Sequence, residues 1–123
     1  MSSAFARASA SVLWHNPKCS KSRAALALLQ GRGVPFSVRE YLEEPPTLAE
    51  LETLHKALGR PPLEWVRTGE PEWKGIGGAP SESDVLKAIV SHPSLLERPI
   101  FVSGERAVVG RPPETVLTLL GGT

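Results

Sequence analysis

The sequence predicts an α/β fold built on a mixed four-stranded sheet. Strand, helix and strand patterns follow one another over residues 11–41, and this βαβ order calls for two parallel strands joined by a right-handed crossover. Two short apolar runs near the end of the chain, separated by a glycine-containing turn, predict a β-hairpin before a last helix. Two or three inserted helices are expected between these units.

The βαβ unit has recognisable boundaries. Residues 11–15 form a short apolar run, and the Asn-Pro-Lys that follows it ends the strand because proline restricts both itself and the residue before it. The predicted helix begins at Ser20, is rich in Ala and Leu, and stops at Gly31. Residues 34–41 alternate apolar and polar side chains, which predicts the second strand.

The middle of the chain is predicted to be helical around one long loop. Thr47 and Glu50 have the spacing of a capping box, which opens a helix with leucines at helical spacing. Residues 60–81 are rich in Gly and Pro, and a loop of that length in a compact domain is usually functional. We expect a helical turn at 63–66 and a further helix over 83–91.

The end of the chain completes the sheet. The hairpin strands are predicted at 99–103 and 107–109, and a last helix at 114–120 has proline near its first turn. We expect residues 1–10 to form a flexible tail and residues 11–123 to form a single domain.

Composition excludes several classes of protein. The 123 residues are 41% hydrophobic and 22% charged, which is ordinary globular usage. Fourteen basic against thirteen acidic residues argue against non-specific nucleic-acid binding, and no apolar run suits a membrane span. One cysteine excludes an internal disulfide and a multi-cysteine metal site, so we expect no bound metal and a cytoplasmic location.

That cysteine, Cys19, is the candidate nucleophile. It is expected where a loop becomes a helix, facing unpaired backbone N–H groups and the positive end of the helix dipole. Lys18, Lys21 and Arg23 add positive charge within one turn. All of these favour a thiolate and predict a pKa below the ordinary value of about 8.5. The alternative, a buried structural cysteine, suits strand interiors and apolar helix faces better than this polar junction.

Three distant arginines are candidates for an oxyanion pocket. Arg67 lies in the long loop, Arg98 precedes the hairpin, and Arg111 follows it. A guanidinium presents a planar fork that suits tetrahedral oxyanions, and fixed cations would overcome the repulsion between an anion and a thiolate. Each arginine taken singly is better explained as a solvated charge, and spacing alone does not show that they converge. Trp65 and Trp73 are candidates for a lid over such a pocket.

The motifs together resemble the glutaredoxin-linked arsenate reductase family. The resemblance covers roughly residues 12–120 in order. It rests on His-Asn-Pro-Lys-Cys-Ser-Lys-Ser-Arg at 15–23, Arg67 in a Leu/Trp-rich loop, Glu-Arg-Pro-Ile at 97–100 and Gly-Arg-Pro-Pro-Glu at 110–114. It implies a thioredoxin-like fold with inserted helices, with Arg98-Pro99 as the cis-proline turn of that fold.

The resemblance also implies a reaction. Cys19 would attack arsenic, glutathione would resolve the adduct as a co-substrate, and glutaredoxin would regenerate the enzyme. The absence of a second cysteine agrees with this, because reducing arsenate takes two electrons and one thiol cannot supply both. The implied roles of the other residues are binding of arsenate or a similar small oxyanion by Arg67, Arg98 and Arg111, and tuning or orienting of the thiolate by His15 and Ser22.

Two other functions fit parts of the pattern. A glutathione-linked oxidoreductase of monothiol-glutaredoxin type is consistent with Cys19 and Ser22. Spx-like regulators, which bind RNA polymerase, share the fold, but they usually have a Gly-Tyr-Asn type turn where this chain has Gly-Arg-Pro-Pro-Glu at 110–114. That difference favours the reductase.

Overall fold

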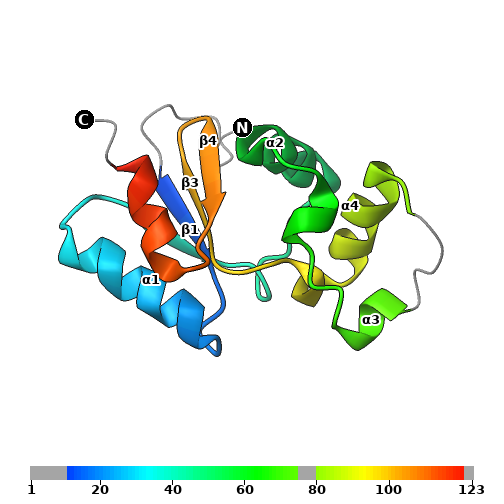
Figure 1. The fold of residues 1–123 in the computed structure, drawn as a ribbon, viewed down its shortest axis with the longest axis horizontal. Helices are drawn as coiled ribbons and strands as arrows, with labels where there is room; N and C mark the ends of the chain where they lie inside the picture. The colour runs from blue at the N-terminus through cyan, green and yellow to red at the C-terminus, as the bar shows by residue number, and fades with distance from the viewer. Residues whose placement is uncertain (1–10, 75–79, 121–123) are drawn as a thin grey trace.

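The computed structural model of the chain describes residues 11–74 and 80–120. A central sheet has helices on both faces, and a group of helices extends from one side of it (Figure 1). The predicted tail at 1–10 and the 75–79 part of the predicted loop lie outside the described residues.

The sheet is mixed and four-stranded, as predicted. Its order is β2-β1-β3-β4, with β1 parallel to β2 and the other two pairs antiparallel. The strands are β1 (Ser11–His15), β2 (Ser37–Glu40), β3 (Ile100–Ser103) and β4 (Arg106–Val109).

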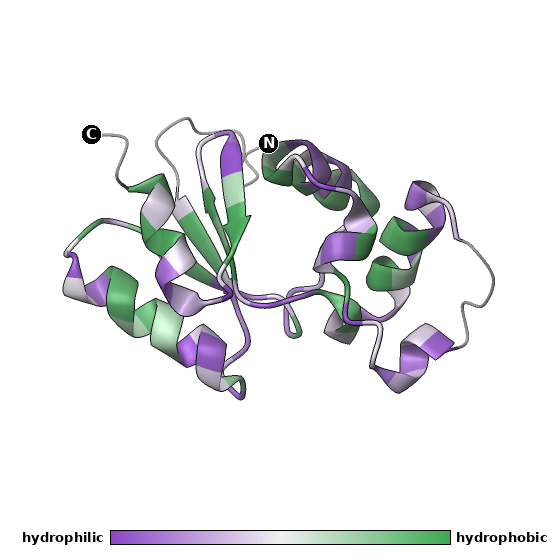
Figure 2. Cartoon of the chain, viewed as in Figure 1, coloured by the Kyte–Doolittle hydropathy of each residue, from purple (hydrophilic) through white to green (hydrophobic). Residues whose placement is uncertain are grey.

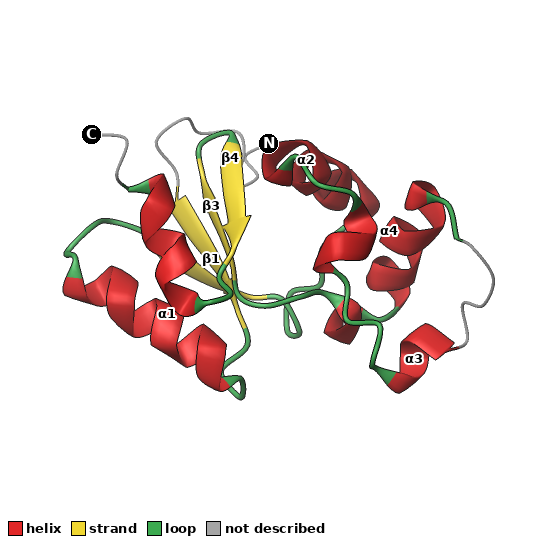
Figure 3. Ribbon diagram, in the orientation of Figure 1, coloured by secondary structure: helices red, strands yellow, loops and turns green. Residues whose placement is uncertain are grey.

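The helices form two groups on opposite faces of the sheet (Figure 3). The first helix and the last 3₁₀ helix lie on one face, and the inserted helices lie on the other. The α-helices are α1 (Ser20–Gly31), α2 (Leu48–Leu58), α3 (Pro71–Lys74) and α4 (Glu82–Ser91), and the 3₁₀ helices are η1 (Pro62–Trp65), η2 (Pro93–Leu95) and η3 (Pro113–Leu119).

Strand alternation divides the core into two clusters. Successive side chains of a strand point to opposite faces, so Leu13 packs under α1 and η3 while Trp14 packs under the inserted helices. The ribbon coloured by hydropathy shows hydrophobic residues on the strands and on the helices of both groups (Figure 2). The smaller cluster consists of Leu13, Ala25, Leu29, Phe101 and Val116.

The larger cluster includes Trp65, which decides whether this residue is part of the core or a candidate for a lid. Trp65 is fully buried at the end of η1, and its indole Nε1 donates to the Arg60 carbonyl at 3.1 Å. A fully buried side chain with a satisfied polar atom belongs to the core, so the lid interpretation is wrong for Trp65. Trp73 in α3 is partly buried and packs against the same cluster.

The second strand differs most from its predicted boundaries, and the last helix differs in how it is wound. The second strand covers only Ser37–Glu40 rather than 34–41, because Pro35 has no N–H for a ladder and its neighbours Val34 and Phe36 pack against the smaller cluster. The last helix is present at Pro113–Leu119 and is wound as a 3₁₀ helix.

Helix starts follow their sequence signals. The capping box predicted at Thr47 and Glu50 is confirmed, with both reciprocal hydrogen bonds present. A second capping box joins Ser81 to Asp84 at the start of α4, where the sequence analysis recorded no signal. The predicted turn in the long loop is confirmed as η1, while α3 was not predicted.

The register brings four chain segments to one edge of the sheet. His15 at the end of β1 pairs with Glu40 at the end of β2, and Ile100 at the start of β3 pairs with both Trp14 and Val109. The loops after β1, β2 and β4 and the segment before β3 therefore meet at this edge. Among the described residues, no helix is long and apolar enough to cross a membrane.

Candidate active site

Cys19 is the N-cap residue of α1. Its backbone is extended, with φ −97° and ψ 125°, while its carbonyl already accepts the first helical hydrogen bond from the Arg23 N–H at 3.0 Å. The Cys19 N–H donates to the Asn16 carbonyl at 3.0 Å, which closes the tight loop after β1. The side chain is partly exposed. The thiol therefore lies at the junction of loop and helix predicted for it, and it is not a buried structural cysteine.

The pKa of the Cys19 thiol is lowered, and the predicted contribution of the helix start is confirmed, whereas that of the neighbouring side-chain cations is not. Partial burial raises the pKa, and this is outweighed by the backbone N–H groups of Ser22 and Lys21 and by the Arg98 guanidinium. The N–H groups face the sulfur without the geometry of a formal cap hydrogen bond. The main contributions thus come from the helix start and a distant arginine rather than from the side chains of Lys18, Lys21 and Arg23.

His15 and Ser22 hold the loop that carries the cysteine. His15 Nδ1 and Ser22 Oγ are 2.6 Å apart, and the Ser22 oxygen also accepts from the Asn16 N–H at 3.0 Å. Asn16 Oδ1 in turn accepts from the Lys18 N–H at 3.0 Å. His15, Asn16 and Ser22 are buried, so water competes little for these bonds.

Burial and the charges of Glu40 and Arg23 set the pKa of His15. Burial lowers the pKa of His15, Glu40 raises it and Arg23 lowers it, with a net lowering. His15 is therefore a neutral imidazole over a wider pH range than an ordinary histidine. The Arg23 guanidinium donates to the Pro17 carbonyl at 2.8 Å, which places it on the outer side of the loop.

Arg111 and Arg98 approach the sulfur from the hairpin. Arg111 Nη2 is 3.9 Å from Cys19 Sγ, and Arg111 Nε donates to the Arg98 carbonyl at 2.8 Å. Burial lowers the pKa of Arg98, but the neighbouring Cys19 and Tyr41 raise it by more. Arg98 and Arg111 each precede a proline in a cis peptide bond, which confirms the turn implied for Arg98-Pro99.

Arg67 joins the other arginines through the carboxylate of Glu97. One oxygen, Glu97 Oε1, lies 3.2 Å from Arg67 Nη1 and 3.0 Å from Arg111 Nε, and it accepts from the Arg98 N–H at 3.3 Å. Glu70 binds Arg67 Nε from the other side at 3.2 Å. The three predicted arginines are thus brought together, and Glu97 is a central residue of the cluster that the sequence analysis did not single out.

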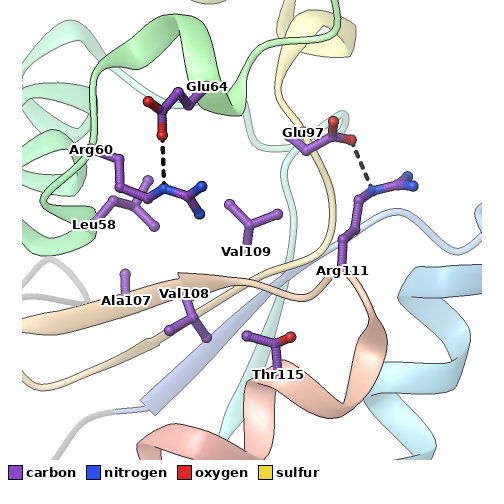
Figure 4. A pocket seen from close by; sticks show the side chains of 9 residues that line it. All are labelled: Leu58, Arg60, Glu64, Glu97, Ala107, Val108, Val109, Arg111 and Thr115. Carbon is purple, nitrogen blue, oxygen red and sulfur yellow. Dashed lines mark hydrogen bonds and ion pairs between the residues drawn. The ribbon is translucent and has the colours of Figure 1, made fainter.

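A cavity adjoins this cluster (Figure 4). Its volume is about 270 Å³, and it lies between β4, α2 and the segment around η1. The ion pair of Glu97 with Arg111 lines it on one side and the pair of Arg60 with Glu64 lines another. The cavity therefore has room for a small molecule beside Arg111, but Cys19 is not among the residues that line it.

The chemistry available here is that of a thiol with fixed cations. Within the ranges 11–74 and 80–120, no group of three or more His, Cys, Asp or Glu side chains could hold a metal ion.

Tyr41 is a second residue that the sequence analysis did not assign to the site. Its hydroxyl lies near Arg98 and Asn16, and the signal available in the sequence was its position at the end of the predicted second strand.

Fold and site together define a class of protein. A βαβ unit and a ββα unit share one mixed sheet, and a thiol stands at the start of the first helix opposite a cis-proline turn, which is the arrangement of a thioredoxin-like protein with a single cysteine. The chain belongs to the ArsC family, whose model matches residues 14–119.

Known proteins of similar sequence and structure agree with this assignment. The chain is 39% identical over 113 residues to a protein of Haemophilus influenzae named arsenate reductase, covering 89% of this chain and 97% of that protein. It is 42% identical over 112 residues to an arsenate reductase of Neisseria meningitidis, covering 88% and 96%. The solved structure of an arsenate reductase from Vibrio cholerae superposes with a TM-score of 0.84 at 40% identity, covering 91% of this chain and 98% of that chain.

Proposed function

We propose that this protein is an arsenate reductase that uses Cys19 as its nucleophile. The observation that carries the proposal is the thiol with a lowered pKa at the start of α1, with Arg111 Nη2 3.9 Å from its sulfur. A thiolate beside a fixed guanidinium can receive an oxyanion that would otherwise be repelled. The names of the family relatives supply the substrate, arsenate.

The proposed reaction divides a two-electron reduction between protein and solution thiols. The Cys19 thiolate attacks As(V), an S–As bond forms, and one arsenate oxygen leaves as water. The thiol of glutathione then attacks Cys19 Sγ, the S–As bond breaks, and arsenic keeps the electron pair and leaves as arsenite. A second thiol, on glutaredoxin or another glutathione, reduces the resulting mixed disulfide. In sum, arsenate and two glutathiones give arsenite, oxidised glutathione and water.

The three arginines are proposed to bind the anion in different ways. Arg98 and Arg111 are proposed to contact the oxyanion directly, because both adjoin the sulfur. Arg67 is linked to them through Glu97. We propose that Arg67 also contacts the anion once the anion has displaced the Glu97 carboxylate from it. His15 and Ser22 are proposed to act indirectly, by keeping the Cys19 loop in place.

The proposed electron donors require no group bound permanently to the protein. Glutathione acts as a co-substrate and glutaredoxin as a partner protein, and the reducing cytoplasm that supplies both is the proposed compartment. With one cysteine in the whole chain, an external thiol is needed in every turnover.

The test is a coupled assay with glutathione, glutaredoxin, glutathione reductase and NADPH. Wild-type protein should show NADPH consumption that depends on arsenate, and Cys19→Ser should abolish it while keeping the fold by circular dichroism. Consumption with a disulfide substrate such as glutathionylated peptide, and none with arsenate, would instead identify the monothiol-glutaredoxin type of oxidoreductase. Inactivity in both assays would contradict an enzymatic role and favour an Spx-like regulator.

A further inference from the structure

Two buried polar groups beside Cys19 have no hydrogen-bond partner within the described part of the chain. They are the hydroxyl of Tyr41 and Nε of Arg98. Tyr41 is fully buried, and although Arg98 and Asn16 lie near its hydroxyl, neither meets hydrogen-bond geometry with it. Leaving a buried donor unpaired is unfavourable, so native proteins seldom keep such groups unless a ligand or a water satisfies them.

The topology explains why the hydroxyl of Tyr41 reaches the site. Tyr41 directly follows β2, whose last residue, Glu40, pairs with His15 at the end of β1. Because β1 and β2 are parallel, the residues that follow both strands lie at the same edge of the sheet. The Tyr41 ring packs in the larger core cluster with Trp14 and Leu96, which fixes its position.

We infer that the hydroxyl of Tyr41 is a further substrate-binding group, which donates a hydrogen bond to the oxyanion held beside Cys19. The inference rests on the proposed function, since it adds a neutral donor to the three arginines of that site. The unpartnered Nε–H of Arg98 is the second donor left free for the same anion. Cys19 raises the pKa of both Arg98 and Tyr41, which places the two side chains within electrostatic reach of the sulfur.

The ionisation of Tyr41 is consistent with a donor. Burial raises the pKa of the Tyr41 phenol, and the lowering by Arg98 and Asn16 does not reverse this. The group is therefore an O–H over the whole neutral range and can donate to an anion without repelling it. A phenolate at this position would compete with the oxyanion for Arg98.

The test is Tyr41→Phe, which removes only the oxygen. Inorganic phosphate is the probe, and the readout is the phosphate concentration that half-protects Cys19 from iodoacetamide. We expect this concentration to rise on the order of tenfold, since hydrogen bonds to charged groups are the stronger ones. We also expect an unchanged or slightly raised Tm, because an unpartnered hydroxyl contributes nothing to the free protein. If the phosphate concentration that half-protects Cys19 is unchanged, the inference is overturned, whether or not the Tm falls.

Ser11→Ala is the matched control. It removes a hydroxyl that is paired with Ser103 at 3.1 Å, at the opposite end of β1 from Cys19. It should lower the Tm slightly and leave phosphate protection unchanged. The contrast separates loss of a ligand-binding donor from loss of a structural hydrogen bond.

A second measurement needs no variant. Tyr41 is the only tyrosine in the sequence, so protein labelled with ¹³Cζ-tyrosine gives a single ring signal. That signal should shift on titration with phosphate and saturate at the concentration that protects Cys19. A signal that does not move while Cys19 is protected would contradict the inference. Both measurements use phosphate without turnover, so they stand apart from the arsenate assay.

Discussion

The guanidinium of Arg111 lies 3.9 Å from the sulfur of Cys19, although the two residues are 92 positions apart. Cys19 follows β1 and Arg111 follows β4, and the pairing through β3 brings the two loops to one edge of the sheet. A hydrogen bond from Arg111 Nε to the Arg98 carbonyl and an ion pair with Glu97 fix the position of the side chain. The Nη groups are thereby aimed at the sulfur, where an incoming anion would lie.

Replacing Arg111 should weaken anion binding strongly. Arg111→Ala removes a guanidinium that lies 3.9 Å from the sulfur, so we expect the apparent KM for arsenate to rise about tenfold or more. Arg111→Lys should recover only part of the loss, because an ammonium has no planar fork. Steady-state kinetics would measure both.

Arg23→Ala is the control for that experiment. Its guanidinium donates to the Pro17 carbonyl and not to the sulfur, so KM should change little. Equal losses in the Arg23 and Arg111 variants would contradict a specific role for Arg111.

Glu97→Gln should tighten anion binding. The Glu97 carboxylate partly neutralises Arg67 and Arg111 through one shared oxygen, and an oxyanion must compete with it. Removing the negative charge while keeping a similar shape should lower the phosphate concentration that half-protects Cys19, by roughly fivefold for a partly exposed ion pair. Alkylation protection would measure the change.

A charge of the same sign on another side of the cavity provides the comparison. Glu64 is half exposed and pairs with Arg60. Glu64→Gln should leave phosphate protection close to wild type. Weaker protection in Glu97→Gln than in Glu64→Gln would mean that Glu97 positions the arginines more than it neutralises them.

Gly110→Ala should destabilise the protein through a clash at the site. An added Cβ would lie 2.7 Å from Pro99 Cγ and 3.0 Å from Val116 Cγ1, in a buried position just before Arg111. Overpacking of this kind costs about 1–3 kcal/mol. Gly69→Ala, where nothing lies within 4 Å of the added atom, should be close to neutral. Urea unfolding would compare the free energies of unfolding of the two variants. Equal values would contradict the prediction, because they would mean that Pro99 moves aside without cost.

Glu50→Gln should reduce stability at neutral pH and lose its effect in acid. The Arg39 guanidinium holds the pKa of Glu50 below its usual value, with the Thr47 N–H assisting against the effect of burial. A lowered carboxyl pKa contributes stability above the ordinary value of about 4.3, and that stability is lost as pH falls through the lowered pKa. We expect a loss of about 1 kcal/mol at pH 7. A difference in unfolding free energy that stays constant down to strongly acid pH would contradict this assignment.

Local features of the fold were predictable from the sequence. Proline and glycine mark the ends of β1 and α1, and the Thr47 capping box depends on residues three positions apart. The position of Cys19 at a helix start follows from the same local signals. The predicted second strand is longer than β2 because the alternation of apolar and polar residues continues through Val34 and Phe36. These two side chains are apolar because they pack against the smaller cluster, not because they belong to a strand.

The convergence of the site was not predictable from spacing. Arg67, Arg98 and Arg111 meet only because of the strand register and the shared carboxylate of Glu97, and both are tertiary. Glu97 belongs to the Glu-Arg-Pro-Ile motif at 97–100, but nothing in the local sequence shows that its carboxylate joins Arg67 to Arg111. The role of Trp65 stayed open for a similar reason, since a tryptophan in a Gly- and Pro-rich loop gives no indication that the loop folds back onto the core.

The rate of Cys19 alkylation by iodoacetamide as a function of pH addresses the thiolate itself, before any substrate is considered. The N–H groups of α1 and the Arg98 guanidinium stabilise the anion, so the inflection should lie below the ordinary thiol value of about 8.5. Arg98→Ala should move it upward. An inflection at about 8.5 or above in wild-type protein would contradict the thiolate on which the proposed chemistry depends.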